Sequence, residues 1–280
     1  MNLEGPLVSA EWLAQNLDSE KLLVLNATLP KVASDTEEQL EESLQIPGAR
    51  FFDIKNRFSD LTAPFPNTML EAQTFNVAAR NLGVKKNSVL VVYDEYGIYS
   101  SARVWWMFRA MGHRDVAVLN GGLIAWKAAG LPLEKKQKYD DAVGDFEGEY
   151  NRKYFKNYSQ VLDQIEDPNS LIVDARGESR FLGRSEEPRK GLRSGHIPRS
   201  VNLPYAELLQ DGHLISKDQL INTFKKLNPD KKNMTFSCGS GITACVLALG
   251  AEMAGLNNSS VYDGSWTEWG SLDELPVEKG

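Results

Sequence analysis

The sequence has little of what several common classes of function require. It contains only three histidines and two cysteines in 280 residues, and no histidine lies in a cysteine or carboxylate pattern, so a metal site is not expected. Its 31 basic residues are outnumbered by 38 acidic residues, which gives a net charge of −7. Without an excess of positive charge, nucleic acid and anionic lipid are not expected as partners.

Long apolar runs are also absent. No stretch approaches the ~18 uninterrupted apolar residues of a membrane span, and the N-terminus lacks the basic and apolar regions of a secretion signal. Cys238 and Cys245, if they lie on one helix, would be about 10 Å apart, which is beyond disulfide reach. We therefore predict a protein of a reducing compartment, the cytoplasm.

What the chain does contain is a weak internal repeat. Four segments of the first half have counterparts in the second half, in the same order and at similar offsets. The pairs are 23–27 with 171–175, 46–49 with 197–200, 89–94 with 234–238, and 118–122 with 261–265. Two copies of one domain explain this order most simply.

The pattern within each copy predicts an α/β fold. Short apolar runs rich in β-branched residues alternate with helical patterns such as 101–111 and 217–227, which is typical of a mainly parallel sheet flanked by helices. Residues 135–150 are highly charged and interrupted by glycine, as linkers often are. We predict a first domain over 1–134, a linker over 135–150 and a second domain over 151–280.

The segment around Cys238 carries the strongest chemical signal. Cys238 follows an apolar run and precedes a short loop rich in Gly and Ser, after which a helical pattern begins at Ala244. Loop amides and the positive end of a helix dipole can stabilise a thiolate in this position. Cys245 falls inside the apolar helix and is expected to be a small core residue.

The repeat places Asp94 where the second copy has Cys238. Both residues come directly after an apolar run, at the predicted carboxyl end of a strand, where α/β sheets bind ligands. Two similar scaffolds therefore carry different side chains at the same strand end. Only the second copy is expected to be catalytic.

Four segments together resemble the tandem rhodanese-like sulfurtransferases, and in particular their branch that uses 3-mercaptopyruvate. They are residues 103–107, 195–198, 238–244 and 262–269. The resemblance covers nearly the whole chain and implies two rhodanese-like domains without metal or organic cofactor. It also implies that Cys238 takes sulfane sulfur from a donor, holds it as a persulfide and passes it to cyanide, a small thiol or thioredoxin.

Further site residues follow from the same resemblance. Arg180 and Arg189 match the two arginines that hold the keto acid in this family, and guanidinium groups suit carboxylate and keto oxygens. The loop residues that would line the donor site carry no charge; they are Gly239, Ser240, Gly241, Ile242 and Thr243. A loop without charge favours mercaptopyruvate, whose carboxylate lies away from its sulfur, over the compact dianion thiosulfate.

Ser240 is a second candidate catalytic residue, because its hydroxyl could bond the sulfur or protonate the departing enolate. In the resembled family such a serine is proposed to act with a histidine, which we align before Ile-Pro-Gly-Ala. This chain has Gln45 there, and glutamine cannot ionise. His196 and Asp174 are expected to make structural hydrogen bonds, and Trp266 to pack against the sheet or the other domain.

Three alternative functions differ in donor or in class. A thiosulfate sulfurtransferase would use the same chemistry with another donor, and a persulfide carrier or binding module would turn over no small donor. A cysteine phosphatase would need an arginine at the end of a longer loop, where this chain has Ala244. The relative kcat/KM values with mercaptopyruvate and thiosulfate would separate a thiosulfate sulfurtransferase from an enzyme that uses mercaptopyruvate.

Overall fold

The chain forms two compact units in the computed structural model, which describes residues 2–30, 44–137 and 143–280. Unit 1 comprises residues 1–59, 70–151 and 211–214, and unit 2 comprises 60–69, 152–210 and 215–280. Each half of the sequence thus gives a short segment, 60–69 or 211–214, to the unit built mainly from the other half. The predicted limits 1–134 and 151–280 remain a prediction, and the predicted linker includes residues 138–142, which lie outside the described residues.

A five-stranded sheet forms the centre of unit 1, and all its paired strands are parallel. The strand order is β1 (Leu7–Val8), β6 (Val116–Leu119), β5 (Val89–Tyr93), β2 (Leu22–Asn26) and β4 (Arg50–Phe51). Every residue of β5 is buried, as a continuous apolar run in a parallel sheet predicts. A short antiparallel pair, β3 (Leu44–Gln45) with β7 (Glu134–Lys135), lies outside this sheet.

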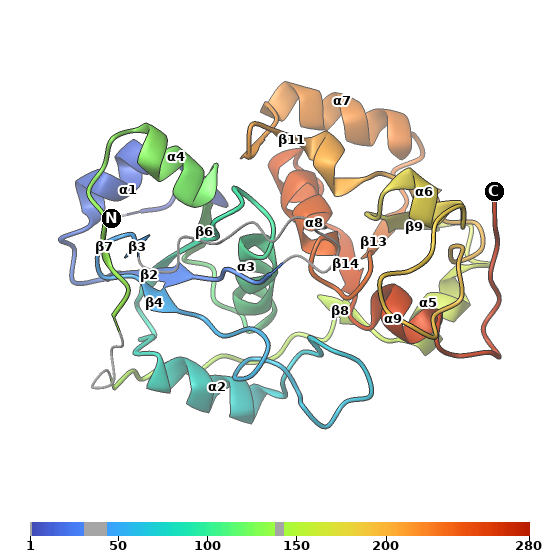
Figure 1. Ribbon diagram of the computed structural model, residues 1–280, viewed down its shortest axis with the longest axis horizontal. Helices are drawn as coiled ribbons and strands as arrows, with labels where there is room; N and C mark the ends of the chain where they lie inside the picture. The colour runs from blue at the N-terminus through green and yellow to red at the C-terminus, as the bar shows by residue number, and fades with distance from the viewer. Residues whose placement is uncertain (1, 31–43, 138–142) are drawn as a thin grey trace. The chain divides into compact units, whose positions relative to one another are not determined.

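Helices cover both faces of this sheet (Figure 1). On one face, α1 (Ala10–Asn16) and α4 (Gly122–Ala128) pack Leu13 and Trp126 against strand residues such as Val91. On the other face, α2 (Ala72–Asn81) and α3 (Ser101–Ala110) bring Phe75 and Phe108 together, with ring centroids 5.3 Å apart.

Unit 2 repeats this architecture. Its parallel sheet has the order β10 (Val201–Asn202), β9 (Ser170–Asp174), β13 (Asn233–Ser237), β14 (Ser259–Tyr262) and β8 (Phe155–Lys156). Strand β11 (Leu209–Gln210) lies outside this sheet, and β12 (His213–Leu214) belongs to unit 1.

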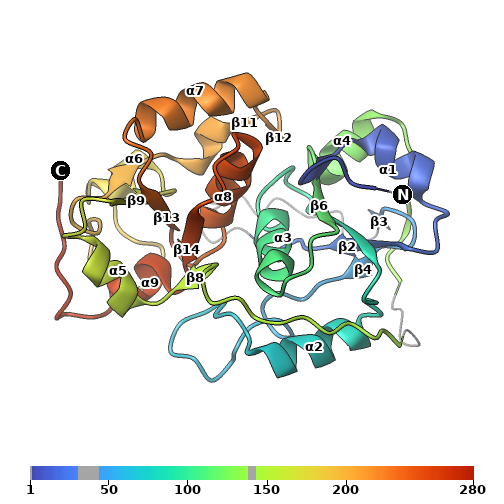
Figure 2. The same ribbon diagram turned by 180° about the vertical axis from the view of Figure 1, so that it is seen from behind.

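The helices of unit 2 also lie on two faces, as Figure 2 shows from behind. One face carries α5 (Tyr158–Gln164) and α9 (Ser265–Trp269), and the other carries α7 (Lys217–Leu227) and α8 (Ala244–Met253). The short elements α6 (Glu178–Phe181) and η1 (Tyr205–Leu208) follow β9 and β10. Because α8 contacts the sheet, α7 and η1, its residues from 244 to 251 are all buried.

The two sheets confirm the repeat and the α/β fold class that the sequence predicts. β2, β5 and β6 hold the same places in one sheet that β9, β13 and β14 hold in the other, and these are the segments that match in sequence. The predicted helices at 101–111 and 217–227 are α3 and α7. A capping box at Ser216 and Gln219 starts α7.

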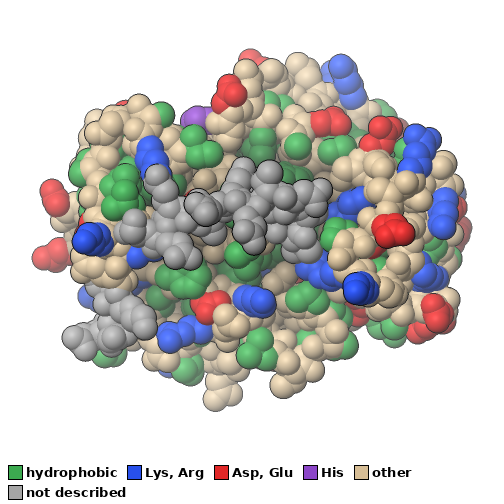
Figure 3. Space-filling view, viewed as in Figure 1, with side chains coloured by type: hydrophobic (Ala, Val, Ile, Leu, Met, Phe, Trp, Pro, Cys, Tyr) green, Lys and Arg blue, Asp and Glu red, His purple; other side chains and the backbone are tan. Residues whose placement is uncertain are grey.

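No helix in the described part of the chain is both long and apolar enough to span a membrane. On the face drawn in Figure 3, basic and acidic side chains are interspersed. This mixture agrees with a net charge of modest size.

The loop after β5 is closed by the side chain of Asp94. This buried carboxylate accepts hydrogen bonds from the amides of Tyr96 at 3.0 Å, Tyr99 at 2.8 Å and Ser101 at 2.9 Å. In the second copy, the same offset from Cys238 leads to Ser240, Thr243 and Cys245. The first copy therefore shows that a loop of this length and position can surround a negatively charged group with amides.

We predict that Asp94→Ala will destabilise the protein by about 3 kcal/mol or more, because the amides that bond this carboxylate lose a charged acceptor. Urea unfolding measures the change. Glu20→Ala removes the same charge from an exposed position and should change stability by less than about 0.5 kcal/mol. Equal stabilities of the two variants would contradict the role given to Asp94.

Candidate active site

Cys238 lies at the carboxyl end of the central strand of unit 2. β13 ends at Ser237, and α8 begins at Ala244, so residues 238–243 form the loop between them. Cys238 is a free cysteine and is buried. Cys245 is also free, lies on α8 and donates its thiol hydrogen to the carbonyl of Gly241 at 3.3 Å. Its buried place on the helix is the one that the sequence predicts.

The start of α9 holds this loop through backbone and hydroxyl groups. Ser265 Oγ accepts the amides of Cys238 and Gly241, each at 3.1 Å, and donates to the carbonyl of Tyr262 at 2.8 Å. The amide of Trp266 donates to the carbonyl of Cys238 at 2.9 Å. The amide and the hydroxyl of Thr267 both donate to the carbonyl of Gly239, at 2.9 and 2.5 Å.

The sequence predicts that the loop amides stabilise a thiolate, but these bonds show a different arrangement. Two of them, from Cys238 and Gly241, point to Ser265 and not to the sulfur. The hydroxyl of Ser265 lies 3.9 Å from Cys238 Sγ and already donates to a carbonyl. Among the described residues, the amides of Ser240 and Thr243 have no acceptor, so they remain available for a bound anion.

Arg180 and Arg189 both come close to the loop beside Cys238. A Cβ atom at Gly239 would lie 3.3 Å from Arg180 Nη2 and 3.9 Å from Arg189 Nη1. Glycine at this position therefore keeps open the space next to the two guanidinium groups. The structure brings together the cysteine, the loop and the two arginines that the sequence selected, although their distances in the chain are large.

Arg180 contacts a buried network that includes Arg176 and Glu187, two residues that the sequence did not select. Arg176 contacts Asp174 at 2.7 Å and Glu187 at 2.8 Å, and its guanidinium carbon lies 4.3 Å from the centre of the Trp266 ring. Burial alone would lower the pKa of Arg176, but attraction by the two carboxylates outweighs this effect and raises its pKa. The expected structural role of Asp174 is confirmed by this ion pair.

His196 also has the structural role that we expected. Its Nδ1 lies 2.8 Å from the carbonyl oxygen of Phe181, and its ring stacks on the Phe181 ring with centroids 3.9 Å apart. The indole of Trp266 is fully buried and donates to the carbonyl of Arg193 at 2.9 Å. These contacts indicate a structural role for both side chains and not a catalytic one.

Ser240 has a different partner from the one that the sequence suggested. Asn67 Nδ2 donates to both the carbonyl oxygen and Oγ of Ser240, each at 3.2 Å. Gln45 instead donates to the carbonyl of Ala49 and to Glu134, each at 2.9 Å. Both of these contacts lie within unit 1, whereas Asn67 belongs with Ser240 to unit 2.

Asn67 could not be found by spacing. It lies 173 residues before Ser240 and in no helix or strand. Its φ of 64° is the one local sign that its position is special, since asparagine is among the few residues that tolerate this conformation. That angle is visible only in the structure.

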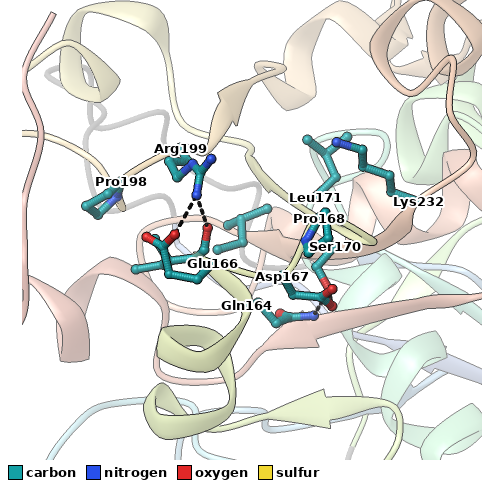
Figure 4. A pocket seen from close by; sticks show the side chains of 11 residues that line it. Gln164, Glu166, Asp167, Pro168, Ser170, Leu171, Pro198, Arg199 and Lys232 are labelled. Atoms are coloured by element: carbon teal, nitrogen blue, oxygen red, sulfur yellow. Dashed lines mark hydrogen bonds and ion pairs between the residues drawn. The ribbon is translucent and has the colours of Figure 1, made fainter.

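A cavity of about 140 Å³ lies at the other end of the same sheet (Figure 4). Its lining includes Ser170, where β9 begins, and Lys232, just before β13, together with the Arg199–Glu166 ion pair at 2.8 Å. Because β9 and β13 are parallel, this cavity is at their amino ends, whereas Cys238 follows the carboxyl end of β13. Within the described chain, no group of three His, Cys, Asp or Glu side chains could hold a metal ion.

Comparisons with known proteins agree with this geometry. The sequence model of the rhodanese-like domain matches residues 9–129 and 157–272. The chain is 40% identical over 273 residues to 3-mercaptopyruvate sulfurtransferase of Mus musculus, which covers 94% of this chain and 91% of that protein. It is 38% identical over 275 residues to the protein of the same name from Escherichia coli K12, with 97% of each covered.

Two further similarities bear on donor and fold. Thiosulfate sulfurtransferase of Rattus norvegicus is 37% identical over 273 residues, covering 94% of this chain and 91% of that protein. The crystal structure of SseA from Escherichia coli, described as a 3-mercaptopyruvate sulfotransferase with a rhodanese fold, matches with a TM-score of 0.81 and 35% identity. That match covers 94% of this chain and 99% of the other.

We predict that Ser265→Ala will reduce activity at least about tenfold in folded protein, because the amides of Cys238 and Gly241 lose their common acceptor and the loop loses its shape. Steady-state kinetics and thermal unfolding measure the two effects. Ser260→Ala is the matched control, since Ser260 is buried on β14 and bonds Thr235 and not the loop. Full activity in folded Ser265→Ala would show that the loop keeps its shape without this residue.

Proposed function

Because the chain belongs to the rhodanese-like sulfurtransferase family, we propose that Cys238 takes sulfur from 3-mercaptopyruvate and passes it to a thiophilic acceptor. The observation that carries the proposal is the placement of Arg180 and Arg189 over Gly239, directly beside the cysteine. Two guanidinium groups beside the residue that follows the nucleophile suit a donor that carries both a sulfur atom and a carboxylate.

The first half-reaction uses Cys238 as the nucleophile. Its thiolate attacks the thiol sulfur of mercaptopyruvate, a sulfur–sulfur bond forms, and the carbon–sulfur bond of the donor breaks. The electron pair of that bond stays on carbon as the enolate of pyruvate, and the donor's thiol proton balances its protonation to pyruvate. The enzyme is left as the persulfide anion of Cys238.

The second half-reaction regenerates the thiolate. Cyanide or the thiolate of a small molecule attacks the outer sulfur of the persulfide and leaves as thiocyanate or as a new persulfide, while the electron pair of the sulfur–sulfur bond returns to Cys238. Reduced thioredoxin would accept the sulfur in the same way. The donor and the acceptor thus react in separate steps.

The loop supports this chemistry by stabilising negative charge. In the first copy, amides at three positions bond the carboxylate of Asp94. The corresponding amides of Ser240 and Thr243 are available for the outer sulfur, and the amino end of α8, a ten-residue helix, follows directly. Negative charge on the thiolate and on the persulfide would be stabilised by the same groups.

The loop and the arginines favour mercaptopyruvate over thiosulfate as donor. Residues Gly239, Gly241, Ile242 and Thr243 bring no charge to the sulfur, so a donor must bind through groups away from it. Arg180 and Arg189 provide such groups for the carboxylate and the keto oxygen. Thiosulfate is the alternative donor, and the similarity to thiosulfate sulfurtransferase of Rattus norvegicus is the observation that favours it.

Ser240 acts in this proposal as a hydrogen-bond donor. Because Asn67 donates to Ser240 Oγ, the hydroxyl hydrogen stays free to bond a sulfur or an enolate oxygen. Neither side chain ionises near neutral pH, so this pair positions a hydrogen bond and does not relay a proton to a base.

A location in the cytoplasm stays a prediction, and so does thioredoxin as an acceptor.

If a persulfide forms on Cys238, the mass of the chain should change, and the change should depend on this cysteine. After exposure to mercaptopyruvate without acceptor, the intact chain should gain the mass of one sulfur atom, and cyanide should remove it. Cys238→Ser should show neither the gain nor pyruvate release, whereas Cys245→Ser should keep most of both. Mass spectrometry with a pyruvate assay decides the matter, and equal losses in the two variants would refute the assignment of Cys238.

A second prediction concerns Asn67. Asn67→Asp should lower kcat with mercaptopyruvate by more than about tenfold, because a carboxylate would accept the Ser240 hydroxyl hydrogen and add negative charge beside the loop. Asn67→Gly tolerates the same positive φ and removes only a neutral hydrogen bond, so its loss should stay below about tenfold. Steady-state rates that rank the variants in the opposite order would contradict the donor role of Ser240.

A further inference from the structure

The segment 60–69, which brings Asn67 to the catalytic loop, is also joined to the rest of unit 2 through its last residue. The backbone amide of Met69 donates a hydrogen bond to Asp263 Oδ2 at 2.8 Å. Met69 and Asp263 are both buried, so water competes little for this bond. Because a carboxylate oxygen is a strong acceptor for an amide, Asp263 holds the end of the segment.

Asp263 belongs to the same stretch of chain that holds the catalytic loop. It directly follows β14, and Ser265, two residues later, accepts two amides of that loop. The amide of Asp263 donates to the carbonyl of Lys156 on β8 at 3.0 Å, which ties this stretch to the sheet. One short stretch after β14 therefore holds both the loop with Ser240 and the segment with Asn67.

The bond at Met69 is close enough along the chain to set the position of Asn67. The two residues are two positions apart, and an extended chain covers at most about 7 Å over that distance. Asn67 Nδ2 lies 3.2 Å from Ser240 Oγ, which is at the upper end of the usual range for an N–H···O hydrogen bond. A small displacement of the segment would therefore break the bond between Asn67 and Ser240.

The first copy contains the same kind of bond at the matching place. Asn120 corresponds to Asp263 in the repeat, and its Oδ1 accepts the amide of Leu214 at 2.9 Å. Leu214 is the last residue of the segment that the second half gives to unit 1, as Met69 is of the segment in unit 2. Both amide donors belong to buried apolar residues. This recurrence indicates that the position after the strand serves to hold the exchanged segment.

We infer that Asp263 is a positioning residue for sulfur transfer, which keeps Asn67 beside Ser240. It acts by holding the amide of Met69 and not by contact with the donor. This inference rests on the proposed function, in which the Ser240 hydroxyl bonds a sulfur or an enolate oxygen. Because negative charge develops on these atoms during the reaction, loss of the positioning lowers kcat more than it changes KM.

Amide hydrogen exchange tests the bond at Met69 without any reaction. In Asp263→Ala, peptides that cover residues 60–69 should exchange at least about tenfold faster than in the wild type, because the Met69 amide loses its acceptor and the segment opens more often. Asn120→Ala is the matched control, which should speed exchange at 211–214 and leave 60–69 unchanged. Unchanged exchange at 60–69 in folded Asp263→Ala overturns the inference.

Steady-state kinetics with mercaptopyruvate and cyanide tests the positioning. Asp263→Ala should lower kcat about fivefold with KM within about twofold of wild type, whereas Asn120→Ala should keep both within about twofold. In Asn67→Gly protein, which lacks the bond to Ser240, the same substitution of Asp263 should change kcat by less than about twofold. An unchanged kcat overturns the inference. A fivefold loss that persists in Asn67→Gly, or that Asn120→Ala shares, also overturns it, because Asp263 would then act through the fold as a whole.

Thermal unfolding shows whether each variant is folded. If Asp263→Ala is not, Asp263→Asn replaces it in both measurements, since the first copy carries asparagine at this position and a neutral oxygen is a weaker acceptor. Its kcat should fall about threefold in the wild type and stay unchanged in Asn67→Gly, and the opposite result overturns the inference. A wild-type protein that releases no pyruvate from mercaptopyruvate overturns the proposed function instead, while the exchange rates still decide whether Asp263 holds the segment.

Discussion

The hydroxyl of Ser265 accepts the amides of Cys238 and Gly241, and the geometry of the catalytic loop depends on this pair of hydrogen bonds. A loop of six residues between a strand and a helix has many possible conformations, and ordering it costs conformational entropy. The start of α9 offsets that cost by bonding both ends of the turn. The amides of Ser240 and Thr243, which have no acceptor in the described chain, stay available for an anion.

The two copies show how one scaffold supports two different loops. In unit 1 the negative group is built in, because the Asp94 carboxylate fills the ring of amides. In unit 2 a cysteine stands at the same strand end, and in the proposed mechanism its negative charge appears with the thiolate and the persulfide. The same backbone device therefore stabilises the fold in one copy and is available for chemistry in the other.

Much of the fold could be predicted, because the apolar periodicity of each copy is strong. The buried run of β5 predicts a central parallel strand, and the matching order of segments predicts the second sheet. The site was predicted only in part. Cys238 follows from its place between strand and helix, but Arg180 and Arg189 came from family resemblance, and nothing local distinguishes Glu187 from its exposed neighbour Glu186.

The sequence by itself determined the two α/β domains and the loop that carries Cys238, because these depend on short-range patterns of apolar and glycine residues. The tertiary structure alone decided which distant side chains complete the site. Asn67 reaches Ser240, and Ser265 reaches the loop, through positions of the backbone that depend on the packing of whole elements. A matching motif drew attention to Gln45, but the partner that the structure gives Ser240 within its own unit is Asn67.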